Sequence, residues 1–173
     1  MIRMFLVLLM AMLAFSAVSC DKGEYAPPAG MQAASDEKAA FCLFVPDDWT
    51  LDYSTAAAGA YYSKDDPSSV SLMAWELEHT DTTLDEWWEM NRAEISVVFS
   101  DVEEISAENT TLDGTYAKKY VYTAKLGEFS YKILQVACIE GGDVYLFTYT
   151  SLPDHYDAHL DDVEQILRYV VIK

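Results

Sequence analysis

Apolar residues recur at helical spacing in a segment near the middle of the chain. The stripe runs from Leu84 to Phe99 with a period of 3.6 residues, which predicts an amphipathic helix. Thr83 precedes Glu86 by three residues, which is the signature of a capping box. We therefore expect this helix to begin at Thr83.

The C-terminal residues carry a second stripe of the same period. It starts from Ser151 or Asp154, where we expect the second helix to begin. Its apolar positions are Tyr156, Leu160, Val163, Ile166, Leu167 and Val170.

Between and before these helices the pattern favours β-strands. Strands are predicted where short apolar or alternating runs are bounded by turn residues. The short ones are 41–45, 49–53, 61–62 and 70–77; the acidic segment 101–109 is an edge strand or a loop; the long ones are 115–125, 128–140 and 143–150.

The long strands are apolar on both faces. In 128–140, Ile133 and Ala137 point one way while Leu134 and Val136 point the other. A sheet with one face open to water would alternate between apolar and polar residues, so both faces here need cover. The expected fold is α+β, an antiparallel β-sheet sandwiched between helices in α-β-α layers.

Composition narrows the class of protein. The chain of 173 residues is 51% hydrophobic and 13% aromatic, which is globular rather than disordered, and 3 cysteines are too few for a disulfide scaffold. With 11 Lys and Arg against 29 Asp and Glu, the net charge is −18. Such an acidic chain repels phosphate, so we expect no nucleic-acid partner.

The N-terminus resembles a bacterial lipoprotein signal peptide over residues 1–19. Arg3 precedes an apolar run over 4–18, which is shorter than the roughly 20 residues of a membrane-spanning helix. Small residues then lead to Cys20, as in a lipobox, where the thiol receives a diacylglyceryl chain. An ordinary secreted protein or an uncleaved anchor are the alternatives. We expect a lipid-anchored protein on the extracytoplasmic face of the cell membrane, in a host with one membrane or two.

The rest of the chain divides in two. Residues 20–39 lack periodicity and contain a Pro pair, so we interpret them as a flexible tether. Residues 40–173 form the predicted globular domain.

Several of these features together resemble the PsbP-like domains, which share a fold with the Mog-type Ran-binding and DcrB families. The similar features are Val45-Pro46-Asp47-Asp48-Trp49, the helix start Thr83-Leu84-Asp85-Glu86-Trp87, the turn Leu112-Asp113-Gly114 and the final helix near Tyr169, across residues 40–173. The resemblance implies an antiparallel sheet between helix layers. It also implies a non-enzymatic binding or accessory domain of unknown partner, a protein or a small ligand, and it carries no catalytic signature.

Two other functions stay open. His155, His159 and Asp162 lie on one side of the last predicted helix, as metal ligands can. This makes a metal- or cation-binding lipoprotein the alternative, with no resident cofactor beyond such a divalent cation. Weaker carboxylate candidates for Ca²⁺ are Asp65, Asp66, Asp101, Glu103, Glu104 and Glu108. An enzyme of unrecognised chemistry is the third hypothesis.

The remaining candidates are two cysteines and three aromatic residues. Cys42 and Cys138 can form a disulfide outside the cytoplasm, or can both be buried apolar thiols. Tyr61, Tyr62 and Trp88 form a possible partner surface, because an exposed Trp beside the tyrosines would anchor a ligand.

Overall fold

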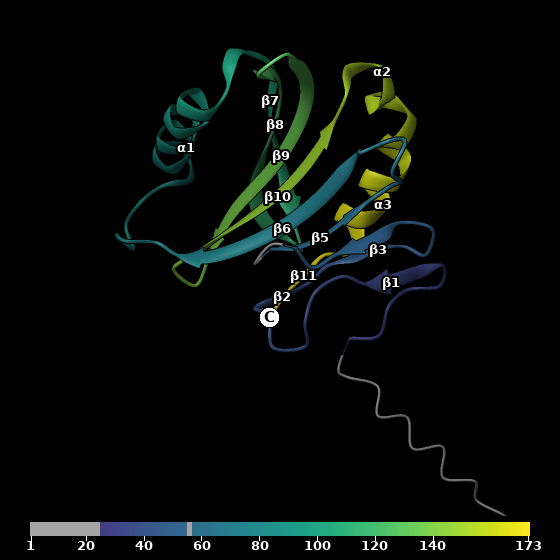
Figure 1. Ribbon diagram of the computed structural model, residues 1–173. Helices are drawn as coiled ribbons and strands as arrows, with labels where there is room; N and C mark the ends of the chain where they lie inside the picture. The colour runs from purple at the N-terminus through teal and green to yellow at the C-terminus, as the bar shows by residue number, and fades with distance from the viewer. Residues whose placement is uncertain (1–24, 55–56) are drawn as a thin grey trace, which may run out of the picture.

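A seven-stranded antiparallel sheet forms the centre of the computed structural model, which describes residues 25–54 and 57–173 (Figure 1). The strand order is β4-β5-β6-β10-β9-β8-β7. These strands are β4 Thr50–Asp52, β5 Ala58–Tyr61, β6 Ser69–Glu76, β7 Ser100–Leu112, β8 Thr115–Leu126, β9 Phe129–Glu140 and β10 Asp143–Ser151. The predicted leader and Cys20 lie outside the described residues.

Helices cover both faces of this sheet. Helix α1, Leu84–Val98, lies on one face, and α2 Pro153–Tyr156, the 3-10 turn η1 Asp157–His159 and α3 Leu160–Tyr169 lie on the other (Figure 1). Two separate apolar clusters result, one under α1 with Trp88 and one under α3 with Phe147. The two-faced strands are thus buried on both sides, and the expected α+β fold with α-β-α layering is confirmed.

The start of α1 follows from its capping box. Thr83 Oγ1 accepts a hydrogen bond of 3.3 Å from the Glu86 N–H, and the Glu86 carboxylate accepts one of 2.9 Å from the Thr83 N–H. These reciprocal bonds satisfy two N–H groups that the helix cannot satisfy itself.

The C-terminal helix is not continuous as predicted. The helical segment begins at Pro153. Proline has no N–H group, but an N–H in the first turn would have no partner within the helix, so no helical hydrogen bond is lost. The chain then tightens into η1 before α3 begins at Leu160. The break falls at His159, whose side chain is hydrogen-bonded to Asp66, a residue between β5 and β6.

Residues 31–33, expected to belong to a flexible tether, form strand β1, Met31–Ala33. This strand pairs antiparallel with β3, Phe44–Pro46, and Met31 is buried. A strand of three residues is too short to show a period in the sequence. Its extended conformation is stabilised by pairing with β3. A second small pair joins β2, Phe41–Cys42, to β11, Val171–Ile172.

The acidic segment 101–109 lies within the edge strand β7, which pairs with β8 through a turn at Asp113 and Gly114. Both turn residues have positive φ, 48° and 79°. Carboxylates along an edge discourage pairing with another sheet. Within the described residues, no helix combines the length and the apolar character needed to cross a bilayer.

Candidate functional site

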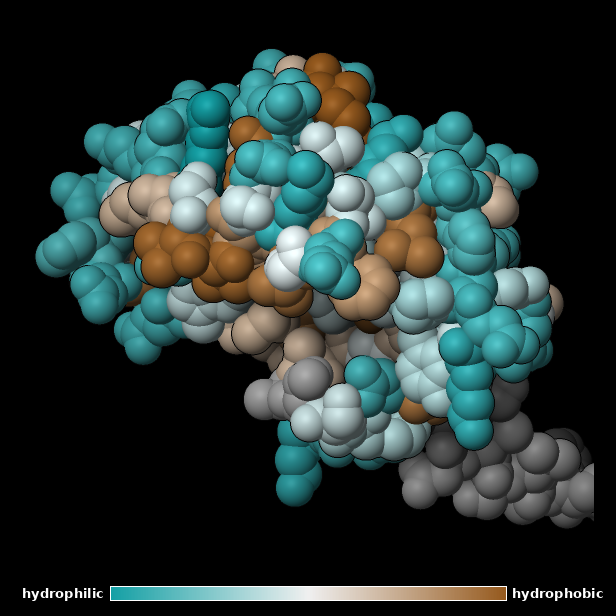
Figure 2. Space-filling view, turned by 45° about the horizontal axis from the view of Figure 1, so that its top comes forward, coloured by the Kyte–Doolittle hydropathy of each residue, from teal (hydrophilic) through white to brown (hydrophobic). Residues whose placement is uncertain are grey.

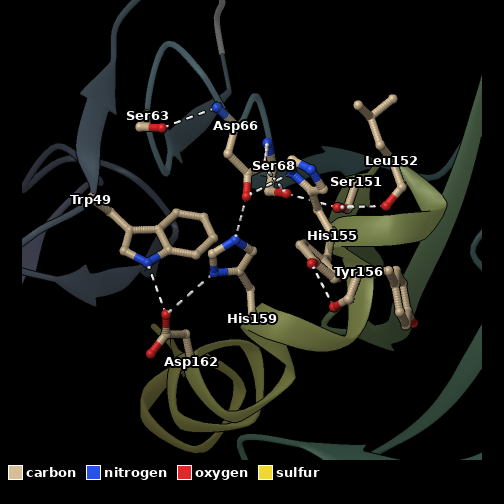
Figure 3. A network of polar contacts seen from close by, with 11 residues as sticks. Trp49, Ser63, Asp66, Ser68, Ser151, Leu152, His155, Tyr156, His159 and Asp162 are labelled. Atoms are coloured by element: carbon tan, nitrogen blue, oxygen red, sulfur yellow. Dashed lines mark hydrogen bonds and ion pairs between the residues drawn. The ribbon is translucent and has the colours of Figure 1, made fainter.

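A buried cluster of polar side chains joins the turn between β5 and β6 to the C-terminal helical segment (Figure 3). Asp66 lies in that turn, and its Oδ2 is 2.8 Å from His159 Nε2 and 2.9 Å from His155 Nδ1. The two imidazoles therefore converge on one carboxylate oxygen.

Two serines complete the cluster. Ser68 contacts the other carboxylate oxygen of Asp66, and Ser151 contacts Ser68. Asp66 Oδ1 accepts bonds from the Ser68 hydroxyl at 2.6 Å and from the Ser68 N–H at 3.1 Å. The Ser68 and Ser151 hydroxyls are 2.7 Å apart, and Ser151 also lies 3.1 Å from the Leu152 carbonyl oxygen. Because the Ser68 proton is directed to Asp66, the single hydroxyl proton of Ser151 is shared between Ser68 Oγ and the Leu152 carbonyl oxygen.

Aromatic rings close the opposite side of the cluster. Trp49 Nε1 donates a 3.1 Å hydrogen bond to Asp162 Oδ2, which lies 3.9 Å from His159 Nδ1. The Tyr62 ring lies 4.2 Å from the His159 ring, between centroids. His159 thus sits between two carboxylates and two aromatic rings, with little access to water.

The charge of Asp66 is stabilised by its donors. Burial by itself raises the pKa of this carboxyl group, but the hydrogen bonds from Ser68 and His159, together with the close contact of His155, outweigh burial and hold the pKa well below its ordinary value of 3.8. Asp66 therefore remains ionised at any ordinary pH.

The geometry indicates a structural role for these groups. A nucleophilic serine needs a base within hydrogen-bond distance of its hydroxyl, usually a histidine. Here Ser68 donates to Asp66, and both Ser68 and Ser151 are buried. The cluster holds the β5–β6 turn against α2 and η1.

The structure brings together only part of the predicted metal set. His155 and His159 converge on Asp66, whereas Asp162 lies against the other nitrogen of His159 and against Trp49. In residues 25–54 and 57–173, no group of three or more His, Cys, Asp or Glu side chains is arranged to hold a metal ion. The cation-binding alternative gains no support from this arrangement.

The acidic residues of β7 have cationic neighbours. Asp101 lies 2.7 Å from Lys125 and Glu108 lies 3.3 Å from Lys119, both measured to Nζ. Glu104 is 4.0 Å from Arg92. The carboxylates that were Ca²⁺ candidates on this strand are thus partly neutralised by the protein.

The two cysteines are buried free thiols, so of the two alternatives left open by the sequence the disulfide is not formed. Cys42 belongs to the small β2–β11 pair, whereas Cys138 lies in the central sheet opposite Ala117. Both contribute to the apolar cluster under α3, as the alternative held. Burial raises the pKa of Cys138 to about 12, which keeps the thiol protonated.

The predicted aromatic partner surface is wrong at Trp88. Its side chain is 6% exposed and stacks on Tyr120, with ring centroids 3.4 Å apart. Tyr62 packs beside Trp49 and His159, and Tyr61 is half-buried. The exposed tryptophan is instead Trp75 on β6, because alternation along that strand turns it away from the α3 side.

Sequence reasoning missed most of the cluster. Asp66 was named only as a weak carboxylate candidate for Ca²⁺, and Ser68, Ser151 and Trp49 were not linked to the histidines. No local signal was available, because the partners come from distant turns, strands and helices.

The chain has a PsbP-like fold, and the resemblance seen in the sequence is confirmed at the level of fold. Cyanobacterial PsbP (CyanoP) from Synechocystis sp. PCC 6803 is similar with a TM-score of 0.61 and 16% identity, over 84% of this chain and 94% of CyanoP. LpqN of Mycobacterium tuberculosis, described as involved in cell envelope biogenesis, is similar with a TM-score of 0.55 and 18% identity, over 77% of this chain and 83% of LpqN.

A third similar structure is PA94 of Pseudomonas aeruginosa, a protein of unknown function described as a putative regulator. Its TM-score is 0.51 at 15% identity, over 78% of this chain and 92% of PA94. No protein-family model and no curated protein matches the chain.

Proposed function

We propose that this chain is a lipid-anchored, extracytoplasmic accessory domain that binds a partner of the cell envelope and performs no catalysis. The observation that carries the proposal is the geometry of the polar cluster: both serine hydroxyls are buried, and the one beside Asp66 donates to the carboxylate rather than to a histidine. This cluster of polar side chains thus stabilises the fold.

The leader supports the location. Residues 4–18 and Cys20 have the pattern of a lipoprotein signal, and the acidic charge of the domain keeps it off an anionic bilayer surface. LpqN, which shares the fold, is described as involved in cell envelope biogenesis. The leader pattern and the similarity to LpqN both support a location in the cell envelope.

Anchoring is tested by mass spectrometry of the N-terminal peptide from membranes of expressing cells. We expect residues 1–19 to be absent and Cys20 to carry the diacylglyceryl mass, and we expect Cys20→Ser to keep its leader or leave the membrane fraction. An unmodified Cys20 in the wild-type protein would contradict the anchor.

Partner binding is tested by photo-cross-linking in cells. Apolar side chains interrupt a largely polar surface (Figure 2), and Met73 and Trp75 are exposed on β6 at 45% and 38%. We expect a photoreactive residue at Met73 to capture a reproducible envelope protein. The same residue at Met90 of α1, which is 53% exposed, is the matched control. Equal and nonspecific capture at both positions, together with activity on a hydrolase substrate panel, would overturn the proposal.

A further inference from the structure

Strand β6 is paired on one of its two sides along only half of its length. It pairs with β10 over all eight of its residues, whereas its last pair with β5 joins Leu72 to Ala58. Within residues 25–54 and 57–173, no strand pairs with residues 73–76 on the β5 side. Such an open edge presents main-chain N–H and C=O groups to which an extended chain can hydrogen-bond.

The direction of these main-chain groups follows from a hydrogen bond at the end of β6. The Leu77 N–H donates to the Gly142 carbonyl oxygen, on the β10 side, at 3.0 Å. The N–H and C=O of one residue point to the same side of an antiparallel strand, and successive residues alternate between the two sides. The main-chain groups of Ala74 and Glu76 therefore point away from β10, toward the open side.

Space is available beside this edge. A cleft of about 690 Å³ is lined by Leu72, Met73 and Ala74 of β6 and by several alanines in the segment 33–40. Alanine side chains are short, so the cleft leaves room for the main chain of another segment to approach β6.

Three carboxylates lie on neighbouring strands at this end of the sheet. Glu76 is directly opposite Asp143 on β10, and Asp143 is directly opposite Glu140 on β9, so all three side chains project from the same face. Like charges opposite each other on neighbouring strands are destabilising. In the described part of the chain, no Lys, Arg or His nitrogen lies within 4.0 Å of these carboxylates, unlike those of β7. A cationic partner relieves this repulsion.

Two exposed apolar side chains project from the other face of the same segment. Met73 and Trp75 alternate with Ala74 and Glu76 along β6, and both are exposed. The Trp75 ring lies 6.1 Å from the Trp87 ring of α1, between centroids, so the helix supports one side of the exposed indole. A tryptophan that is already ordered loses little entropy on binding, which suits it to anchor an apolar side chain of a partner.

We propose that residues 73–76 of β6 dock an extended segment of an envelope protein as an additional strand, in which lysine or arginine alternates with apolar residues. Because side chains alternate between the two faces of a strand, the cations of this segment lie beside Glu76 and the apolar side chains lie beside Met73 and Trp75. A second copy of this chain is a poor occupant, because each copy carries −18 and brings another Glu76 to the edge. This inference rests on the proposed binding function and names the class of partner.

The test measures binding of a fluorescein-labelled peptide, Lys-Val-Lys-Val-Lys-Val-Lys, to the purified full-length chain in nanodiscs of phosphatidylcholine, a lipid without net charge. We expect saturable binding by fluorescence anisotropy that weakens as salt is added. The same peptide with methylated main-chain nitrogens keeps its charges and apolar side chains but cannot donate to a strand, so it should bind about tenfold more weakly or less. Hydrogen–deuterium exchange should slow in the fragment that contains β6 and not in the fragment that contains α3.

Glu76→Lys should weaken binding of the unmethylated peptide by about tenfold, because it replaces an attraction with a repulsion at the docking edge. Glu128→Lys is the matched control. It changes the net charge by the same amount at an exposed position in the turn before β9, at the other end of this strand from Glu140. The control variant should bind the peptide nearly as well as the wild-type chain.

Equal binding to the Glu76 and Glu128 variants, equal binding of the methylated peptide, or slowed exchange only outside β6 would each overturn the inference. Capture of a second copy of this chain from the photoreactive residue at Met73 would overturn it as well. Capture of an envelope protein from Met73 together with a failed peptide test would leave the accessory function standing.

Discussion

His159 Nε2 and Asp66 Oδ2 lie 2.8 Å apart although the two residues are 93 positions apart in the chain. This bond connects the turn after β5 to η1, and Ser68 and Ser151 extend the connection to β6 and β10. One carboxylate thus links the turn between β5 and β6 to α2 and η1. The first two predictions follow from this role.

Asp66→Ala should destabilise the fold by about 2–3 kcal/mol, because it leaves buried donors on Ser68 and His159 without an acceptor. The measurement is the free energy of unfolding from urea denaturation. Asp65→Ala is the control, since the neighbouring Asp65 is exposed, and it should change stability by less than about 0.5 kcal/mol. Equal effects of the two substitutions would show that the cluster does not stabilise the fold.

The same carboxylate should make stability depend on acid pH. The pKa of Asp66 is lowered in the folded state, so the unfolded state binds the proton first as pH falls. Its contribution is complete above about pH 5 and is lost as pH falls through about 4 toward the lowered pKa. Asp66→Asn should show a flatter dependence over this range in urea unfolding. Parallel pH profiles for the wild-type protein and the variant would contradict the assignment.

Trp88 should behave as a core residue. Trp88→Ala should cost about 3–5 kcal/mol of stability, because it removes a buried ring stacked on Tyr120. Trp75→Ala, at a position 38% exposed, should cost about 1 kcal/mol. Thermal and urea unfolding measure both. A Trp88 variant of wild-type stability would restore this residue as a surface candidate.

The two cysteines should be present as thiols that react only after unfolding. In the folded protein burial and the raised pKa of Cys138 protect the sulfur, so a thiol reagent should react slowly. In denaturant without reductant, alkylation and mass spectrometry should find both Cys42 and Cys138 modified. A mass lower by two hydrogens with no alkylation would indicate a disulfide.

Local pattern predicted most of the regular elements. The start of α1 was predictable because Thr83 and Glu86 satisfy each other within one helical turn. The long strands were predictable because apolar residues on both of their faces indicate that both sides of the sheet are buried. The strand β1 and the break at η1 were not, because each depends on contacts with distant segments.

The same limit applies to the candidate site. The spacing of His155 and His159 correctly placed them on one side of the helical segment. Their common partner Asp66, and the burial of Trp88 rather than Trp75, follow from how the β5–β6 turn and α1 pack on the sheet.

By itself the sequence determined the layered α+β architecture and the acidic character, and it predicts a lipoprotein leader, because periodicity, composition and short motifs are local properties. Only the tertiary structure decided that Asp66 collects both histidines, that Cys42 and Cys138 stay apart, and that Glu76 lies beside Asp143. These are contacts between segments far apart in the chain, and their distances are set by sheet pairing and helix packing.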